Sequence, residues 1–249
     1  MAERFKVVLF DLGSTLIYFD GSMPEVVMRG NERLAEALVN QGYPLDKNFV
    51  TTFRTDLQDY FRKRDVDFLE YTVEQVLRQT LLKFGYGEVP ANHLKAALRE
   101  MYALSQAHWK LEDDTVPVLG KLKERGYRLG LISNAADADD VRILIERYQL
   151  DSWFEQVLIS AEAGYRKPHP RIFEMALKFF EAQPDQAVMV GDKLGADILG
   201  AKNAGMASVW ITRRAMRDDN FAHEDTIRPD AVIQALRELP ESLENWSAH

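Results

Sequence analysis

Hydrophobic residues follow two different rhythms along the chain. Residues 5–10, FKVVLF, form a short run rich in β-branched and aromatic side chains that ends at Asp11, which predicts a buried strand. Between about residues 24 and 110, apolar side chains recur three and four positions apart, the spacing of amphipathic helices. This block predicts four helices that can pack together as a small bundle. Its breaks are expected at 41–44, 65–67 and 84–90.

After about residue 112 the pattern alternates between strand-like and helix-like segments. Strands are predicted over residues 127–133, 156–160, 187–190, 208–212 and 231–233. Helices are predicted over residues 138–148, 170–181 and 196–204, with a further helix at the C-terminus. Such alternation predicts an α/β fold with a parallel sheet covered on both faces. Because the helical block separates the first strand from this sheet, we expect a core of residues 1–18 and 113–249 and an inserted helical cap of residues 19–112.

Composition and charge narrow the possible chemistry. The 249 residues carry 31 Lys and Arg against 39 Asp and Glu, a formal charge of −8, which argues against nucleic-acid binding. The absence of cysteine excludes disulfide bonds, thiolate metal sites and cysteine nucleophiles. No apolar stretch approaches the roughly 20 residues of a spanning helix. We therefore expect a soluble, cytoplasmic protein, monomeric or homodimeric, that does not act at a membrane.

Chemically capable residues follow several of the predicted strands. In an open α/β sheet, ligands bind beyond the carboxyl ends of the strands, so these side chains are expected to meet. They are Asp11, Ser133, Asn134, Lys167, Asp192 and Asp197. A single Asp after a strand is commonly a turn residue, but carboxylates, a hydroxyl and an ammonium together favour phosphoryl transfer. A carboxylate can attack phosphorus, Mg²⁺ can neutralise the anionic site, and the other groups can stabilise the transferring oxygens.

Four segments, in order, resemble the motifs of the haloacid dehalogenase superfamily. They are FDLGSTL, LISN, GYRKP, and VGDKLGAD followed by GAKNAGM. The resemblance spans nearly the whole chain and implies a Rossmann-like parallel core with an inserted α-helical cap. It also implies a hydrolase of the phosphatase type, acting on a small phosphorylated metabolite.

The resemblance implies a role for each matching residue. Asp11 would be the nucleophile that forms an aspartyl-phosphate, and Lys167 would pair with it and with the phosphoryl oxygens. Ser133 would bind the phosphate, and Asn134 belongs to the same substrate-binding motif. Magnesium would be held by Asp11, the carbonyl of Gly13 and Asp192, with Asp197 in or near the outer shell of the ion.

One position departs from the phosphatase pattern. Family phosphatases usually carry a second Asp two positions after the nucleophile as general acid and base, where this chain has Gly13. Such assistance is commonly worth about 10²–10⁴-fold, so slow turnover is expected unless Asp20, a cap carboxylate or the substrate replaces it.

Two alternatives therefore stay open. The 2-haloacid dehalogenases of the superfamily also lack that Asp, because a halide leaves without a proton, although GDKLGAD resembles the metal-binding phosphatase form. The other alternative is a catalytically weak relative that binds a phosphorylated ligand or a protein. The run Arg62-Lys63-Arg64, flanked by Asp65 and Asp67, is typical of a solvated helix end; the alternative is a cap residue that meets an anionic substrate.

Overall fold

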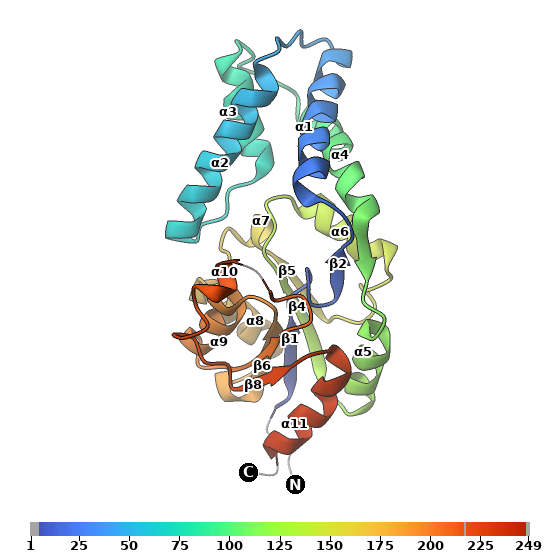
Figure 1. Cartoon of the computed structure of the whole chain (residues 1–249), viewed down its shortest axis with the longest axis vertical. Helices are drawn as coiled ribbons and strands as arrows, with labels where there is room; N and C mark the ends of the chain where they lie inside the picture. The colour runs from blue at the N-terminus through green and yellow to red at the C-terminus, as the bar shows by residue number, and fades with distance from the viewer. Residues whose placement is uncertain (1–4, 217, 248–249) are drawn as a thin grey trace.

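The computed structural model describes residues 5–216 and 218–247. Its lower half is a six-stranded sheet in the order β5-β4-β1-β6-β7-β8, with every neighbouring pair parallel (Figure 1). The strands are β1 (Val7–Phe10), β4 (Arg128–Ser133), β5 (Gln156–Ile159), β6 (Ala187–Gly191), β7 (Ala207–Ile211) and β8 (Ala231–Ile233). The predicted α/β fold with a parallel sheet is confirmed.

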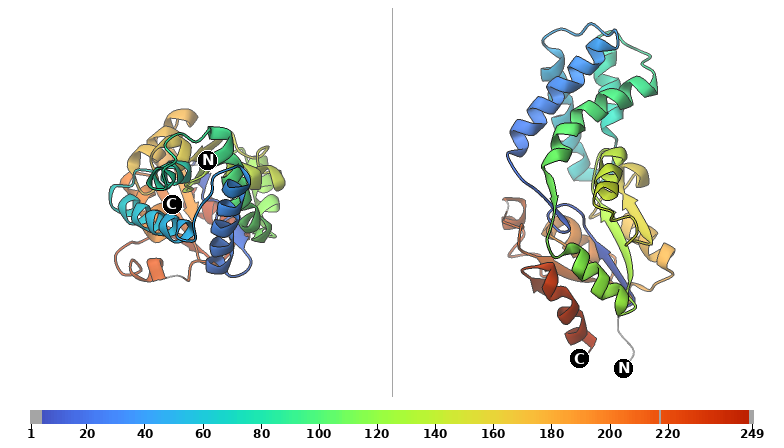
Figure 2. Two further views of the ribbon diagram at one scale, coloured as in Figure 1. Left: turned by 90° about the horizontal axis from the view of Figure 1, so that it is seen from above. Right: turned by 90° about the vertical axis from the view of Figure 1, so that its right-hand side faces the viewer.

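Helices cover both faces of this sheet (Figure 2). Along β1, Val8 and Phe10 point to one face while Val7 and Leu9 point to the other, as the pleat of a strand requires. The first face packs on α5 (Thr115–Glu124), α6 (Ala138–Arg147) and α11 (Leu239–Ser247), and the second on α8 (Pro170–Phe180) and α9 (Leu199–Asn203). Burial on both faces explains why β1 reads as a continuous hydrophobic run.

Several short helical segments complete the lower half. They are α7 (Ser160–Ala163), α10 (Asp218–Phe221), the 3-10 turns Pro184–Gln186 and Leu236–Glu238, and a π-helical turn at Leu194–Ile198. The helix predicted over 196–204 is therefore divided between this π-helical turn and α9. Helix α5 is not among the elements that the pattern predicts.

The upper half consists of four helices that share their own hydrophobic core. They are α1 (Met23–Asn40), α2 (Phe49–Asp67), α3 (Val73–Lys83) and α4 (Ala91–His108), and α1 packs along α4 while α2 packs along α3 (Figure 1). Leu34, Phe53, Leu77 and Leu94 are fully buried between them. The expected helix break at 65–67 is misplaced: α2 continues to Asp67 and ends where Phe68 takes a left-handed backbone conformation.

The two connections between the halves lie side by side. They form a short antiparallel ribbon of β2 (Ile17–Phe19) and β3 (Trp109–Leu111), in which Phe19 is opposite Trp109. Three-residue strands are too short to leave a periodic signal, so the sequence does not predict this ribbon. The division into core and cap at residues 18/19 and 112/113 stays a prediction. Among the described residues, no helix is both long and apolar enough to cross a membrane.

On the opposite side, the loop between α2 and α3 contacts the segment that precedes α8. The backbone N–H of Glu70 donates to the carbonyl of Gly164 over 3.0 Å, and that of Arg166 donates to Phe68 over 3.1 Å. The Oγ of Ser160 donates to Oε2 of Glu70 over 2.6 Å, and the Glu70 side chain is fully buried. The upper half therefore meets the lower half at this loop as well as at the ribbon.

Candidate active site

Three neighbouring strands bring the predicted residues to one edge of the sheet. Strand β1 lies between β4 and β6, so Asp11 follows the central strand, Ser133 ends β4 and Asp192 follows β6. The N–H of Asp11 still donates to the carbonyl of Val190 on β6 over 2.9 Å, which fixes the start of the nucleophile loop. This edge is the place where α/β sheets bind ligands.

Lys167 reaches this edge from the loop before α8. Its N–H donates to Oδ1 of Asn134 over 2.8 Å, and Nδ2 of Asn134 donates back to the Lys167 carbonyl over 2.9 Å. Its ammonium contacts Oδ1 of Asp11 at 2.6 Å and Oδ1 of Asp197 at 2.7 Å, and donates to the Ile132 carbonyl over 2.7 Å. The Asn134 side chain thus holds the lysine loop in place, a positioning role that the sequence does not indicate.

The ionisation of this cluster reflects its burial. Burial raises the pKa of Asp11 from 3.8 to about 6; the Lys167 ammonium opposes this shift and the Asp197 carboxylate adds to it. Burial alone would lower the pKa of Lys167, but the two carboxylates outweigh it and raise that pKa. The lysine is therefore held as a cation beside the predicted nucleophile.

Asp11, Asp192 and Asp197 form a cluster that could hold a metal ion. Each offers a carboxylate oxygen, and these oxygens lie within 4.8 Å of one another. Asp192 and Asp197 are each only 1% exposed. Hard divalent cations such as Mg²⁺ prefer oxygen donors of this kind, so the residues present fit such an ion.

A glycine makes room for Asp197 in this cluster. A Cβ at Gly191 would lie 2.3 Å from Cγ and Oδ2 of Asp197, so no other residue fits there without a shift. The backbone N–H of Lys193 donates to Oδ2 of Asp197 over 2.9 Å, which further fixes the carboxylate. Asp197, expected in or near the outer shell of the ion, therefore contacts Lys167 and lies beside Asp11 and Asp192.

Gly13, the position of the missing Asp, lies in a tight loop beside Trp109. The next residue, Ser14, has a left-handed φ of 62°, and Leu16 and Ile17 donate backbone hydrogen bonds to Leu12. A Cβ at Gly13 would lie 3.4 Å from Cη2 of Trp109, an ordinary contact. The indole therefore borders the space into which a side chain at this position would extend.

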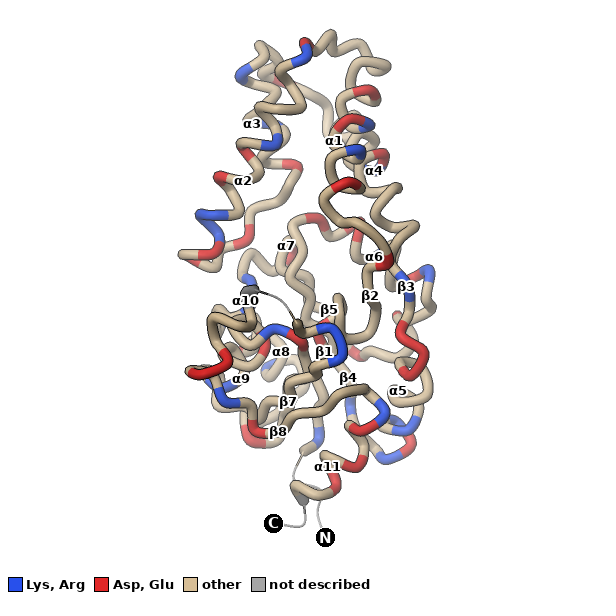
Figure 3. Tube along the Cα trace, viewed as in Figure 1, with Lys and Arg blue, Asp and Glu red and all other residues tan. Residues whose placement is uncertain are grey.

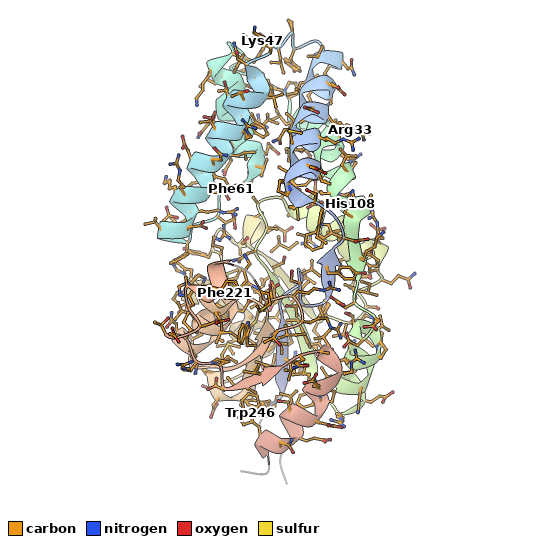
Figure 4. All side chains as sticks on the ribbon, viewed as in Figure 1. Arg33, Lys47, Phe61, His108, Phe221 and Trp246 are labelled. Carbon is orange, nitrogen blue, oxygen red and sulfur yellow. The ribbon has the colours of Figure 1, made fainter. Side chains whose placement is uncertain are left out.

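The strand ends open into a cavity of about 980 Å³ beneath the upper helices. It is lined by core residues that include Asp11, Gly13, Ser133 and Lys167, and by residues of the upper half. Phe61, which projects from α2 in Figure 4, belongs to the latter. Both halves of the molecule therefore border the cavity into which Asp11 opens.

Three further acidic residues line this cavity among the described residues: Asp65, Asp137 and Asp140. Asp20 is exposed and is not among the described lining residues, so it does not replace the missing Asp in this conformation. Burial raises the pKa of Asp140 to about 7; its hydrogen bond from Gln106 opposes the shift and the charge of Asp137 adds to it. A group with this pKa carries a proton over part of the neutral range, as a general acid must.

Two residues that sequence reasoning missed fix the backbone of Asp192. Nε1 of Trp210 donates to the Asp192 carbonyl over 2.9 Å, and Nδ2 of Asn220 donates to it over 2.8 Å. Oδ1 of Asn220 accepts from the N–H of Leu194, which ties the same loop a second time. No motif marks these residues, because they come from later segments that only the fold brings back to β6.

A family model for a haloacid dehalogenase-like hydrolase matches residues 5–205. The chain belongs to the haloacid dehalogenase-like hydrolase family. This confirms the resemblance found in the motifs, and with it the expectation of a hydrolase.

Individual relatives of this hydrolase cover nearly the whole chain. It is 32% identical over 242 residues to a glyceraldehyde 3-phosphate phosphatase of Pyrococcus furiosus, covering 97% of this chain and 93% of that protein. A solved 2-haloacid dehalogenase of Pseudomonas syringae has a TM-score of 0.68 at 25% identity, covering 97% of this chain and 99% of that one. A solved HAD phosphatase of Thermococcus onnurineus has a TM-score of 0.64, also at 25% identity, covering 96% and 98%.

Proposed function

We propose that this hydrolase is a Mg²⁺-dependent phosphatase that acts on small phosphomonoesters through an aspartyl-phosphate on Asp11. The observation that carries the proposal is the cluster of Asp11, Asp192 and Asp197, in which the ammonium of Lys167 contacts Asp11 and Asp197. A halide-displacing enzyme needs no such group of carboxylates, whereas a phosphatase must hold a cation beside an anionic substrate. The phosphatases among the relatives support the same choice over a dehalogenase.

The chemistry assigned to the residues proceeds in two displacements. A carboxylate oxygen of Asp11 attacks phosphorus, the bond from phosphorus to the ester oxygen breaks, and the alcohol leaves after taking a proton. Water then attacks the phosphorus of the aspartyl-phosphate, which releases inorganic phosphate and restores the carboxylate. Lys167 and Ser133 stabilise the charge on the phosphoryl oxygens, and Asn134 keeps the lysine loop in position.

Magnesium would be held by Asp11, Asp192 and the carbonyl of Gly13, with Asp197 beside them. When bound, the ion would offset the repulsion between the carboxylates and the substrate phosphate. The carboxylates are fixed before any ligand arrives, because Gly191 gives Asp197 its space and Asn220 holds the Asp192 loop.

This site lacks the usual donor of a proton to the leaving alcohol. Gly13 offers no side chain, and Asp140 is the cavity acid whose pKa of about 7 suits it to give a proton. We therefore expect esters with acidic leaving groups to react well and alkyl phosphates to react more slowly. For a substrate whose leaving oxygen does not contact Asp140, a water molecule in the cavity must donate the proton to that oxygen.

Phosphate release from p-nitrophenyl phosphate, with and without Mg²⁺, tests the proposal. We expect metal-dependent release that Asp11→Asn abolishes, and glyceraldehyde 3-phosphate is the first metabolite to try because relatives carry that name. Metal-independent chloride release from 2-chloropropionate would instead favour the dehalogenase. Failure of both reactions, even with Gly13→Asp, would favour a binding protein.

A further inference from the structure

Two arginines from distant parts of the chain meet on the wall of the catalytic cavity. Arg64 lies in the last turn of α2, where charged residues of both signs gather above the core (Figure 3), and Arg166 immediately precedes Lys167. Their side chains are only 18% and 13% exposed. The Arg64 guanidinium lies 4.2 Å from the ring centroid of Phe61, which supports it from one side.

One buried carboxylate serves both guanidinium groups. Nη1 of Arg64 is 3.4 Å from Oε1 of Glu70, and Nη1 of Arg166 is 3.7 Å from Oε2. The same carboxylate also accepts hydrogen bonds from the hydroxyls of Tyr60 and Ser160. The two positive charges therefore share the buried, already hydrogen-bonded carboxylate of Glu70 and the exposed carboxylate of Asp65, which lies 3.8 Å from each guanidinium.

The pKa of Arg166 reflects its burial and the neighbouring arginine. Burial lowers the pKa of Arg166, and the nearby charge of Arg64 lowers it further, although Glu70 and Asp65 oppose the shift. Like charges in a poorly solvated site gain from another anion.

Two buried nitrogen atoms of this arginine pair donate no hydrogen bond within the described part of the chain. They are Nε of Arg64 and Nη1 of Arg166. Oδ1 of Asp65 lies 3.8 Å from each of them, beyond hydrogen-bonding distance. The Asp65 side chain is 66% exposed, so it can turn into solvent and leave this position to another carboxylate.

We infer that Arg64 and Arg166 bind a carboxylate of the substrate, which makes this hydrolase selective for phosphomonoesters of carboxylic acids. The inference rests on the proposed phosphatase function. The arginine donors match the acceptor geometry of a carboxylate, whose two oxygens can take both unused N–H groups. The arginines line the same cavity as Asp11 and Lys167, and the inference places the substrate's phosphate on the nucleophile and its carboxylate on the arginines.

A matched pair of substrates tests the inference. 3-Phosphoglycerate and glyceraldehyde 3-phosphate differ in having a carboxylate or an aldehyde at the carbon farthest from the phosphate. We expect kcat/KM to be about 100-fold higher for 3-phosphoglycerate, because a site with unpaired buried donors rejects a ligand that cannot satisfy them. Glycerol bisphosphate serves as a third substrate, which offers a second phosphate in place of the carboxylate.

Variants then assign the selectivity to these side chains. Arg64→Gln and Arg166→Gln should each lower the kcat/KM ratio of the carboxylate substrate to the aldehyde by about tenfold. Asp65→Asn should lower KM for 3-phosphoglycerate, since the competing carboxylate is gone, and because the Asp65 side chain is 66% exposed the variant should fold normally. Arg62→Gln is the matched control, because Arg62 lies on the same helix with a side chain that is 78% exposed, and it should leave the ratio unchanged.

The outcomes separate this inference from the proposed function. Hydrolysis of neither metabolite nor of p-nitrophenyl phosphate would overturn the phosphatase itself. Equal kcat/KM for the carboxylate and the aldehyde, with p-nitrophenyl phosphate hydrolysed, would overturn only the carboxylate site. A preference for glycerol bisphosphate over 3-phosphoglycerate, or a ratio untouched by Arg64→Gln and Arg166→Gln, would overturn it as well.

Discussion

Gly191→Ala tests whether the position of Asp197 matters without altering any carboxylate. The new Cβ would lie 2.3 Å from Cγ and Oδ2 of Asp197 and 2.5 Å from its Cβ. Non-bonded carbon atoms meet at about 3.5–4.0 Å, so Asp197 must withdraw by about 1 Å or more. A displacement of this size can cost about 100-fold in rate, and the overpacking costs about 1–3 kcal/mol of stability.

The assay is hydrolysis of p-nitrophenyl phosphate over a series of Mg²⁺ concentrations, together with thermal unfolding. We expect kcat to fall about 100-fold and half-maximal activity to need more Mg²⁺. Gly120→Ala is the control, because its Cβ would meet Trp153 only at an ordinary 3.7 Å. A Gly191→Ala protein with unchanged kcat, Mg²⁺ dependence and Tm would refute the reasoning.

Three further variants test the missing proton donor at Gly13, the buried carboxyl of Asp140 and the ammonium of Lys167. Gly13→Asp should raise kcat on alkyl phosphates, at most by the 10²–10⁴-fold typical of a general acid, whereas Gly13→Asn should not. The pKa of Asp140 is about 7 in the folded protein against an ordinary 3.8, so the stability of the fold falls as pH rises through that window. Asp140→Asn should therefore raise the free energy of unfolding by about 1–4 kcal/mol above pH 7 and leave it unchanged below pH 4, as urea titrations can check. Lys167→Met removes the ammonium that pairs with Asp11 and Asp197. Without metal, the free energy of unfolding should therefore fall by about 3–5 kcal/mol, and Mg²⁺ should restore part of it. Equal stability of variant and parent in urea would contradict the role of this ion cluster.

The sequence predicts the parts of the site that sit at strand ends. Asp11, Ser133 and Asp192 each follow or end a hydrophobic run, and the rule that parallel strands share one carboxyl edge brings them together without any coordinates. The four helices of the upper half could also be predicted from the sequence, because a long helical periodicity of apolar residues is a strong signal.

Other features depend on contacts that no local pattern encodes. The pairing of Asn134 with the backbone of Lys167 joins residues 33 positions apart, and the approach of Arg64 to Arg166 joins the last turn of α2 to the loop before α8. The ribbon of β2 and β3 consists of strands too short to show alternation. These contacts form only when the whole chain has folded, so they become visible only in three dimensions.

The β2–β3 ribbon and the contacts of Glu70 lie on opposite sides of the cavity, so the upper helices are joined to the core by the chain itself on one side and by non-covalent contacts on the other. Both chain segments that connect the halves run through the ribbon, so the halves cannot separate there without breaking the β2–β3 pairing. The opposite side is held by hydrogen bonds of Glu70 with Ser160 and Gly164, and of Phe68 with Arg166. Opening should therefore begin on the Glu70 side, and because Glu70 contacts both Arg64 and Ser160, the carboxylate that joins the two halves also contacts the proposed carboxylate site.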